Sequence, residues 1–258
     1  MELHYLSQGE LNVRRFFVPP EDCCGGRVTI AGDLFRHMAK VLRLNTGDLV
    51  LLADGKGFEF SGVIRSRGKE SLVVEILESS REPALVNGPL ITLYQGLPKG
   101  DKMDLILQKS TELGVAEIVP FVAFRSVPRI RKGEEDDKLA RWQRIVLEAA
   151  RQSGRPSIPK VALAGGLEDV LRISGHSVKL LLWEEERDSR LKETLAGLHL
   201  PETVALIVGP EGGLSADEAA RARECGFIPV SLGKRIVRTE TASLAMLAIL
   251  QFYWGDLG

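Results

Sequence analysis

The feature that most limits the fold of this chain is a change of hydrophobic pattern between Arg81 and Pro89. After this stretch, apolar runs of strand length alternate with runs of helical period, the longest helix being predicted from Glu135 to Ser153. The predicted strands are Leu90–Leu97, Ala116–Ala123, Val178–Trp183, Thr203–Val208 and Ile228–Leu232. Strands that alternate with helices predict an α/β fold, in which helices cover both faces of a parallel sheet.

The residues before the break have a different pattern, in which short β-type runs are separated by turn residues. The runs are Arg15–Val18, Arg27–Ile30, Asp48–Ala53, Gly57–Ile64 and Ser71–Leu77, and one helix is predicted at Gly32–Arg43. The tetrapeptide Asp54–Gly57 is typical of a hairpin turn, because glycine adopts positive φ without steric cost. Many short strands predict a small β-barrel. We therefore expect two domains, residues 1–80 and residues 81–258.

Composition and charge narrow the possible functions. The chain has 258 residues and a net charge of −1, so any nucleic-acid binding must come from local patches. Its three cysteines form no CxxC pair, and its four histidines form no ligand-spaced pair, so we expect reduced thiols and no metal site. We expect a cytoplasmic protein with no membrane association, because the sequence shows neither a signal-peptide pattern nor an apolar run of bilayer length.

Two segments concentrate basic residues. The predicted helix Gly32–Arg43 carries several, yet residues 1–80 together hold ten Lys and Arg against eleven Asp and Glu. Residues 125–155 hold nine basic residues against five acidic ones. Each segment is either a surface that contacts phosphates or an ordinary solvated helix face, and the charge pattern leaves both interpretations open.

Three loops at the ends of predicted strands carry glycine or polar residues. The loop Val208–Ser215 follows an apolar strand and opens a helix in which Ser215 and Glu218 form a capping-box pattern. This loop is neither a Walker A loop nor a G-x-G-x-x-G motif, which makes ATP and NAD poor candidates. The other loops are Leu232–Arg238 and Trp183–Glu186. Because parallel strands end at one edge of a sheet, these loops could together enclose a ligand with an adenosine and a charged tail.

Two of these segments carry a resemblance to a known family. The run LIVGPEGGLS at Leu206–Ser215 and the run LGKRIVRTETA at Leu232–Ala242 resemble the two signature loops of the RsmE family. Members of this family are SPOUT-superfamily methyltransferases that modify N3 of a uridine in 16S ribosomal RNA. The resemblance covers nearly the whole chain and includes His37–Arg43, Gln95–Lys99, Lys109–Gly114 and Glu148–Arg155.

The resemblance implies a PUA-like β-barrel at the N-terminus and a SPOUT methyltransferase domain with a trefoil knot after it. It also implies S-adenosyl-L-methionine as the cofactor, a homodimer, and small-subunit ribosomal RNA in an assembled subunit as the partner. The implied cofactor contacts are Leu182, Gly209, Glu211, Gly212, Ser231, Leu232, Gly233, Arg235, Ile236 and Thr241. RNA contacts are expected from Arg14, Arg36, Lys40, Arg43, Lys99, Arg125, Arg129, Arg131 and Arg155.

The chemistry implied by this resemblance assigns roles to three charged residues. The N3 nitrogen of uracil must lose its proton, so the protein must stabilise the uracil anion and provide a route for the proton. We expect Arg238 beside the base, because an arginine stays protonated and is a poor general base. Glu211 or Glu240 would take the proton, although either could instead cap backbone amides. Two alternatives remain: methylation of another RNA position, such as a ribose 2′-hydroxyl, and a non-catalytic RNA-binding assembly factor.

Overall fold

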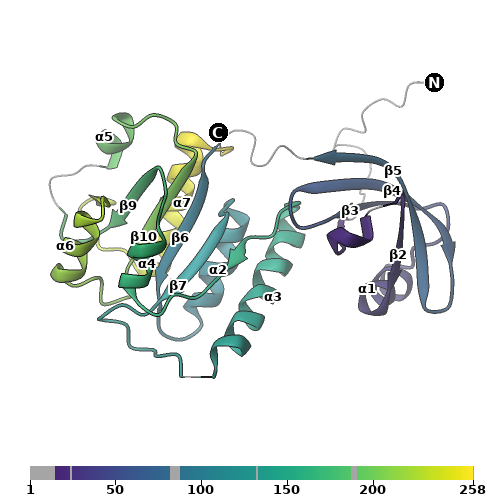
Figure 1. Cartoon of the computed structure of the whole chain (residues 1–258), viewed down its shortest axis with the longest axis horizontal. Coiled ribbons are helices and arrows are strands. Elements are labelled where there is room, and N and C mark those ends of the chain that lie inside the picture. The colour runs from purple at the N-terminus through teal and green to yellow at the C-terminus, as the bar shows by residue number, and fades with distance from the viewer. Residues whose placement is uncertain (1–14, 24, 82–87, 132, 187–190, 258) are drawn as a thin grey trace. The chain divides into compact units, whose positions relative to one another are not determined.

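The computed structural model describes residues 15–23, 25–81, 88–131, 133–186 and 191–257. The chain divides into two compact units (Figure 1). Unit 1 comprises residues 1–84 with 154–157, and unit 2 comprises residues 85–153 with 158–258. None of the helices in the described ranges has the length and apolarity that a membrane crossing requires.

Unit 1 is built on a five-stranded sheet in the order β1-β3-β4-β5-β2. Its strands are β1 (Arg15–Phe17), β2 (Arg27–Ala31), β3 (Leu49–Ala53), β4 (Phe58–Arg67) and β5 (Ser71–Arg81). The strand β1 pairs with β3 in parallel, and the other neighbours are antiparallel. Alternate strand residues, among them Val28, Ile30 and Leu52, point into one apolar core, as expected for a sheet with one buried face.

The predicted hairpin between the third and fourth runs is confirmed by its hydrogen bonds. The side chain of Asp54 accepts hydrogen bonds from the backbone N–H groups of Lys56 (2.7 Å) and Phe58 (3.0 Å). Gly55 and Gly57 have φ values of 73° and 97°, which a side chain would disfavour. The turn chemistry that the sequence contains therefore closes this hairpin.

The predicted helix Gly32–Arg43 is shorter than its sequence pattern suggests. The helix α1 spans Gly32–Arg36 and continues as a π-helical turn, η2 (His37–Val41); a 3-10 turn, η1 (Pro20–Cys23), precedes β2. The guanidinium of Arg67 donates to the carbonyl groups of Ala39 (3.0 Å) and Leu44 (2.9 Å). The Ala39 carbonyl therefore accepts from a side chain where a longer helix would use it, and the chain turns at Arg43 with a φ of 57°.

Unit 2 contains a six-stranded sheet in the order β11-β9-β10-β6-β7-β8, in which every neighbouring pair is parallel. The strands are β6 (Leu90–Gly96), β7 (Glu117–Phe121), β8 (Lys160–Val161), β9 (Val178–Leu182), β10 (Thr203–Val208) and β11 (Ile228–Val230). The helices are α2 (Lys102–Glu112), α3 (Glu135–Ser153), α4 (Leu167–Ile173), α5 (Leu191–Ala196), α6 (Ala216–Glu224) and α7 (Thr239–Trp254). The predicted parallel sheet is confirmed.

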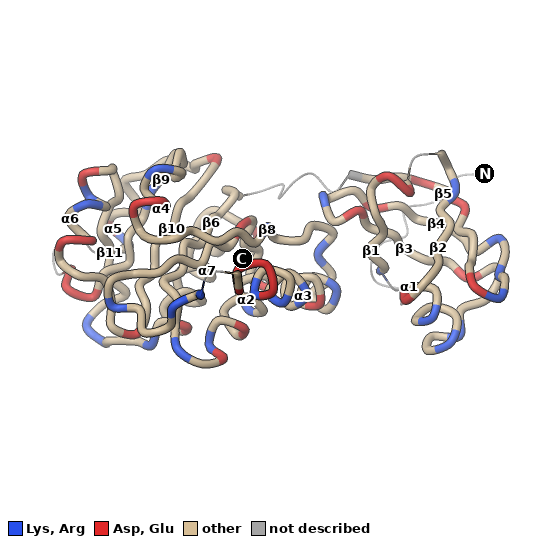
Figure 2. Tube along the Cα trace, turned by 60° about the horizontal axis from the view of Figure 1, so that its bottom comes forward, with Lys and Arg blue, Asp and Glu red and all other residues tan. Residues whose placement is uncertain are grey.

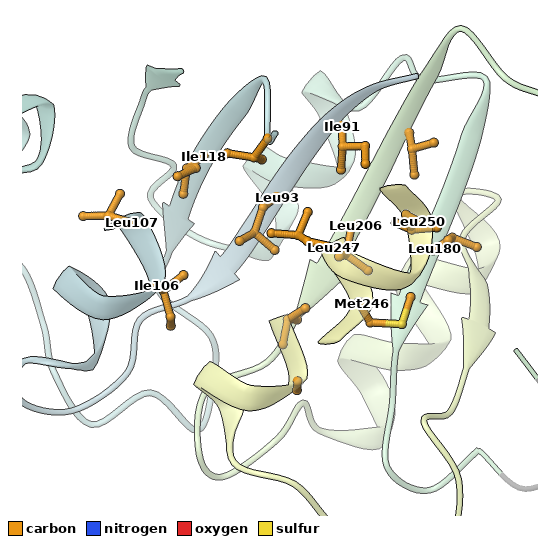
Figure 3. Packing of buried hydrophobic residues seen from close by; sticks show 14 of the residues in the cluster. Ile91, Leu93, Ile106, Leu107, Ile118, Leu180, Leu206, Met246, Leu247 and Leu250 are labelled. Atoms are coloured by element: carbon orange, nitrogen blue, oxygen red, sulfur yellow. The ribbon is translucent and has the colours of Figure 1, made fainter. Parts of the chain in front are cut away.

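Both faces of this sheet are buried under helices. Helices α2, α3 and α7 cover one face, where Leu93 and Leu206 of the sheet lie close to Met246 and Leu247 of α7 (Figure 3). Helices α4 and α6 cover the opposite face, to which neighbouring strand residues such as Tyr94 contribute. Two-sided burial explains why the strands are continuous apolar runs and do not alternate with polar residues.

The order of the strands reverses in the middle of this sheet. After β6 the chain builds β7 and β8 on one side, and it then crosses to build β9, β10 and β11 on the other. The two halves meet where β10 pairs with β6. Open parallel sheets bind ligands outside the carboxyl ends of their strands at such a reversal. The loops that follow β6 and β10 therefore frame the candidate site.

Candidate functional site

The loops after β6, β9 and β10 contact one another at the carboxyl edge of the sheet. A Cβ atom added to Gly96, the last residue of β6, would lie 2.6 Å from the backbone N of Pro210 and 2.9 Å from the backbone C of Gly209. A Cβ atom added to Gly213 would overlap the carboxylate of Glu184, and Gly213 also has a φ of +69°. Gly96 is thus required for the close approach of the loop after β10, and Gly213 of the G-P-E-G-G run is required for the backbone conformation of that loop.

The loop after β10 is fixed at its far end by the capping box that its sequence predicts. Ser215 Oγ accepts from the backbone N–H of Glu218 (3.2 Å), and the Glu218 carboxylate accepts from the backbone N–H of Ser215 (2.9 Å). The same carboxylate accepts from the backbone N–H of Phe124 (2.8 Å), while Arg125 donates to the carbonyl of Gly212 (3.0 Å). The loop after β7 is therefore bound to the loop after β10.

A cluster of charges lies between the first turn of α2, the loop after β10 and the first turn of α7. The Nζ atom of Lys102 lies 2.8 Å from Glu211 Oε1 and 3.7 Å from Glu240 Oε2. The backbone N–H of Lys99 also donates to Glu211 Oε1 (3.0 Å). Partial burial would raise the pKa of Glu211, but the hydrogen bonds from Lys102 and the backbone outweigh it and lower that pKa. Glu211 is therefore an ionised carboxylate already engaged by protein donors.

Arg238 and Glu240 lie on either side of Thr239, at the start of α7. Arg238 is the N-cap residue of α7, and its side chain is exposed. Its positive charge lowers the pKa of Lys102, whereas the hydrogen bond to Glu211 raises that pKa. The side chain of Glu240 is only 13% exposed, and its Oε2 atom has no hydrogen-bond partner among the described residues. A fixed cation and a hydrogen-bond acceptor that is still available therefore lie two residues apart.

A second buried polar atom at this edge lacks a hydrogen-bond partner within the described ranges, the Nε1 atom of Trp183 after β9. The Trp183 ring lies under the guanidinium of Arg223, 5.0 Å from the ring centroid. Arg223 also donates to the buried carboxylate of Glu186 (2.7 Å), which holds the ring and this loop together. Because buried polar groups are normally paired, Trp183 Nε1 and Glu240 Oε2 are groups that a bound ligand would satisfy.

The structure brings the residues predicted to hold the cofactor to one edge of the sheet. Leu182 ends β9, Gly209 and Gly212 follow β10, and the segment Ser231–Ile236 follows β11. Within that segment the backbone N–H of Gly233 donates to Ser231 Oγ (3.2 Å). Arg235 of this segment and Thr241 of α7 are exposed. Ile236 is 89% exposed, which is unusual for an apolar side chain.

The residues predicted to contact RNA fall in several places. Arg14 lies outside the described residues. Lys99 is exposed beside Glu211, and exposed Arg125, Arg129 and Arg131 follow β7. Arg155 belongs to unit 1, where it donates to Ser157 Oγ (3.3 Å). The remaining three, Arg36, Lys40 and Arg43, are exposed on α1 and the turn after it in unit 1. Figure 2 shows basic positions in blue near α1.

The sequence reasoning assigned no site role to two residues of this edge, Lys102 and Gln95. A lysine in the first turn of a helix opposes the helix dipole, and this unfavourable position was a signal that Lys102 has a carboxylate partner. Gln95 interrupts the apolar run Leu90–Leu97 at a position that the structure buries completely. A polar residue at a fully buried strand position was the corresponding signal for Gln95.

Comparison with known proteins places both units in described families. Residues 87–251 match the family described as the RNA methyltransferase domain, and residues 30–77 match the RNA methyltransferase PUA domain. The chain is 33% identical over 232 residues to ribosomal RNA small subunit methyltransferase E of Bacillus subtilis, covering 87% of this chain and 89% of that protein. It is 35% identical to the protein of the same name from Synechocystis, covering 91% and 76%.

Solved structures agree with these matches. The structure of ribosomal RNA small subunit methyltransferase E from Neisseria gonorrhoeae, bound to S-adenosylmethionine, has a TM-score of 0.82 and 35% identity, covering 95% of this chain and 100% of that one. A Legionella pneumophila protein solved with the same cofactor has a TM-score of 0.83 and 32% identity, covering 96% and 100%. The sequence matches span most of both chains, and on them the chain belongs to the ribosomal RNA small subunit methyltransferase E family, RsmE.

Proposed function

We propose that this chain is an S-adenosylmethionine-dependent methyltransferase that methylates N3 of a uridine in the 16S RNA of the small ribosomal subunit. The observation that carries the proposal is the meeting of the glycine-rich loop after β10 with the loops after β6 and β9 at one sheet edge, in a chain of this family. A structure of a relative in the same family holds S-adenosylmethionine. The protein would act in the cytoplasm, where small ribosomal subunits are found.

The residues present at this edge fit such a cofactor. Its adenosine and amino-acid parts offer both donors and acceptors, and the buried Trp183 Nε1 and Glu240 Oε2 have no hydrogen-bond partner among the described residues. The space beside Gly233 is open, since a Cβ added there would meet no atom within 4 Å. We assign the cofactor contacts to Leu182, Gly209, Glu211, Gly212, Ser231, Leu232, Gly233, Arg235, Ile236 and Thr241, with Glu211 acting through its backbone.

The chain's own residues would prepare the acceptor nitrogen. When bound, S-adenosylmethionine supplies an activated methyl group on a sulfonium centre. Arg238 would stabilise the negative charge that develops on the uracil as N3 loses its proton. Glu240 would take that proton, because its Oε2 lies 3.7 Å from Lys102 Nζ and has no hydrogen-bond partner among the described residues, whereas Glu211 accepts hydrogen bonds from Lys102 and Lys99. Glu211 then orders the loop after β10.

RNA would be held by both parts of the chain, with residues 1–80 as the RNA-binding domain and residues 81–258 as the SPOUT methyltransferase domain. The exposed cations of α1 and its following turn in unit 1 (Arg36, Lys40 and Arg43) and those after β7 in unit 2 are the phosphate contacts. The substrate would be RNA in an assembled subunit. The target base must leave its stack to reach Arg238, so these contacts would hold the surrounding nucleotides.

The trefoil knot and the homodimer are also part of this proposal. The strand β11 lies at the sheet edge beyond β9, whereas α7 packs on α2 and β10, so residues 231–238 return across the carboxyl ends of the strands. Such a return path is needed for knotting.

Phe252 and Tyr253 on α7 are 72% and 44% exposed, and a second subunit would cover them. Sedimentation should then give about twice the chain mass of 28.3 kDa, and a monomer mass at micromolar concentration would exclude the dimer.

One experiment tests the activity directly. The protein is incubated with labelled S-adenosylmethionine and small ribosomal subunits that lack the modification, and the labelled nucleoside is identified by mass spectrometry. We expect 3-methyluridine. A 2′-O-methylated nucleoside would mean another acceptor atom, and cofactor binding without transfer to any RNA would favour the assembly-factor alternative.

A further inference from the structure

A buried group of polar side chains joins the three segments that make up the edge described above. Gln95 is 0% exposed, and its Nε2 atom lies 2.9 Å from the carbonyl O of Gly96, 3.4 Å from that of Gly209 and 3.0 Å from Thr239 Oγ1. Thr239 Oγ1 donates to the carbonyl O of Gly209 (2.6 Å), and Ser243 Oγ donates to Gln95 Oε1 (2.5 Å). Both ends of the Gln95 amide are therefore satisfied.

Packing alone does not require a polar residue at this position. Gln95 lies on the same face of β6 as Leu93, which packs in the apolar cluster under α2, α3 and α7. An apolar side chain of similar size would continue that cluster without the free-energy cost of burying an amide. A buried polar group whose partners are all supplied instead fixes one arrangement of the elements that it joins.

The elements that Gln95 joins carry the groups proposed for binding and catalysis. The Gly209 carbonyl accepts from both Gln95 and Thr239, which fixes the start of the loop that carries Glu211. Thr239 lies between Arg238 and Glu240, so anchoring its side chain places both neighbours relative to that loop. The Arg238 side chain makes no capping hydrogen bond of its own at the start of α7.

We infer that Gln95 and Thr239 are positioning residues, which set the loop after β10 against Arg238 and Glu240 at the start of α7. This inference rests on the proposed methyltransferase function. Neither residue touches the reacting atoms in this role, and each acts through the segments it holds. A misplacement of about 1 Å in a reacting group can lower a rate by about 100-fold, so losing either anchor should reduce kcat.

Substitutions at Thr239 and Gln95 test the inference. Thr239→Val and Gln95→Met remove the hydrogen bonds with little change of volume, and kcat for methyl transfer should fall about 10- to 100-fold, while the Kd for S-adenosylmethionine should rise by a smaller factor, because the same loop carries proposed cofactor contacts. Thr239→Ser keeps the hydroxyl and should restore kcat. The double variant should be no slower than the slower single variant, because the group acts as a unit.

A matched control separates positioning from stability. Thr92 lies on the same strand, is 5% exposed, and its hydroxyl lies 2.9 Å from His176 Nε2. Thr92→Val should lower Tm as Thr239→Val does and leave kcat unchanged. Without cofactor, amide hydrogen exchange at residues 209–214 and 238–242 should be faster in Thr239→Val and unchanged in Thr92→Val.

Two outcomes overturn different claims. If Thr239→Val loses stability but keeps the wild-type kcat and exchange rates, Thr239 only stabilises the fold and the positioning role is wrong. If the wild-type protein transfers no methyl group, the proposed function itself fails. Should Gln95→Met not fold, the Thr239 pair of variants still decides the question.

Discussion

Arg238 combines a fixed charge with a rigid backbone position at the first turn of α7. Its side chain is exposed while the next residue, Thr239, is buried and hydrogen-bonded, so the guanidinium projects from an anchored point. A charge held in place before reaction stabilises a developing anion without the cost of reorganising solvent.

Replacing this charge should reduce the chemical step and spare binding of the cofactor. In Arg238→Ala we expect kcat to fall at least about 100-fold, as for other groups that stabilise a developing anion, with the Kd for S-adenosylmethionine nearly unchanged. Single-turnover kinetics and calorimetry measure the two quantities. Arg238→Lys keeps the positive charge but lacks the planar guanidinium group. Its kcat should lie between that of the wild type and that of Arg238→Ala. Wild-type turnover in Arg238→Ala would remove Arg238 from the mechanism.

The Lys102–Glu211 ion pair should make stability depend on pH. The folded-state pKa of Glu211 is lowered from 4.5, so its contribution is complete above that value and is lost as the pH falls through the folded pKa. Donation to Glu211 raises the pKa of Lys102 above 10.5, so its contribution is complete below that value and is lost as the pH rises through the folded pKa. The pair therefore stabilises the fold across the neutral range.

Thermal unfolding of Lys102→Met measures this contribution. Its Tm should be lower than that of the wild type at about pH 7, and the difference should be smaller at an acidic pH below the lowered folded-state pKa of Glu211. The matched control, Lys192→Met on α5, removes the same charge at an exposed position. Its Tm difference from the wild type should not shrink at acidic pH. A constant difference at both pH values would show that the ion pair does not contribute.

Among the elements, the ends of β6 and β10 approach each other closely at Gly96. The Cβ atom of Gly96→Ala would lie 2.6 Å from Pro210, so the loop after β10 must move. We expect a loss of about 1–3 kcal/mol of unfolding free energy, as in other overpacked sites, together with weaker binding of S-adenosylmethionine. Urea unfolding and calorimetry measure these changes.

Gly175→Ala provides the matched comparison for this substitution. A Cβ atom at Gly175 would meet nothing within 4 Å, so the added methyl group costs no space there. Its unfolding free energy and cofactor affinity should stay near wild-type values. Equal effects of the two substitutions would contradict the close-packing explanation for Gly96.

Five of the six strands of the parallel sheet and the carboxyl-edge loops were predictable from sequence, because a parallel sheet buried on both faces produces continuous apolar runs, whereas the two-residue strand β8 was too short to give such a run. Glycine chemistry likewise predicted the Asp54–Gly57 hairpin, and the capping box predicted the start of α6. The tertiary partners of Gln95 and Lys102 were not predictable. They lie 144 residues (Thr239) and 109 residues (Glu211) away along the chain, and local patterns carry no information about such distant partners. The early end of α1 also depends on a distant residue, Arg67.

At the scale of the whole molecule, RNA binding should depend on local charge, because the net charge is only −1. Reversing Arg129 and Arg131 to Glu should weaken binding to small ribosomal subunits, and the slope of log K against log salt should fall by about 1.5 if each contacts one phosphate. Binding titrations at several salt concentrations measure the slope. Arg172→Glu with Lys192→Glu on α4 and α5 changes the charge equally and serves as the control. An unchanged slope would show that Arg129 and Arg131 do not contact phosphates and that the segment after β7 is an ordinary solvated surface.

The sequence distance across the buried Gln95 group has a consequence for the order of folding. Gln95 precedes its partners Thr239 and Ser243 by 144 and 148 residues, so β6 leaves the ribosome long before α7 does during synthesis. Until α7 arrives, the face of the sheet that α2, α3 and α7 cover together stays partly uncovered, and the Gln95 amide lacks its side-chain partners Thr239 and Ser243. Contacts of such long range form slowly, because the chain loses the entropy of closing the long intervening loop before the contacts stabilise it. We therefore expect cofactor binding and methyl transfer to begin only after α7 has been released from the ribosome.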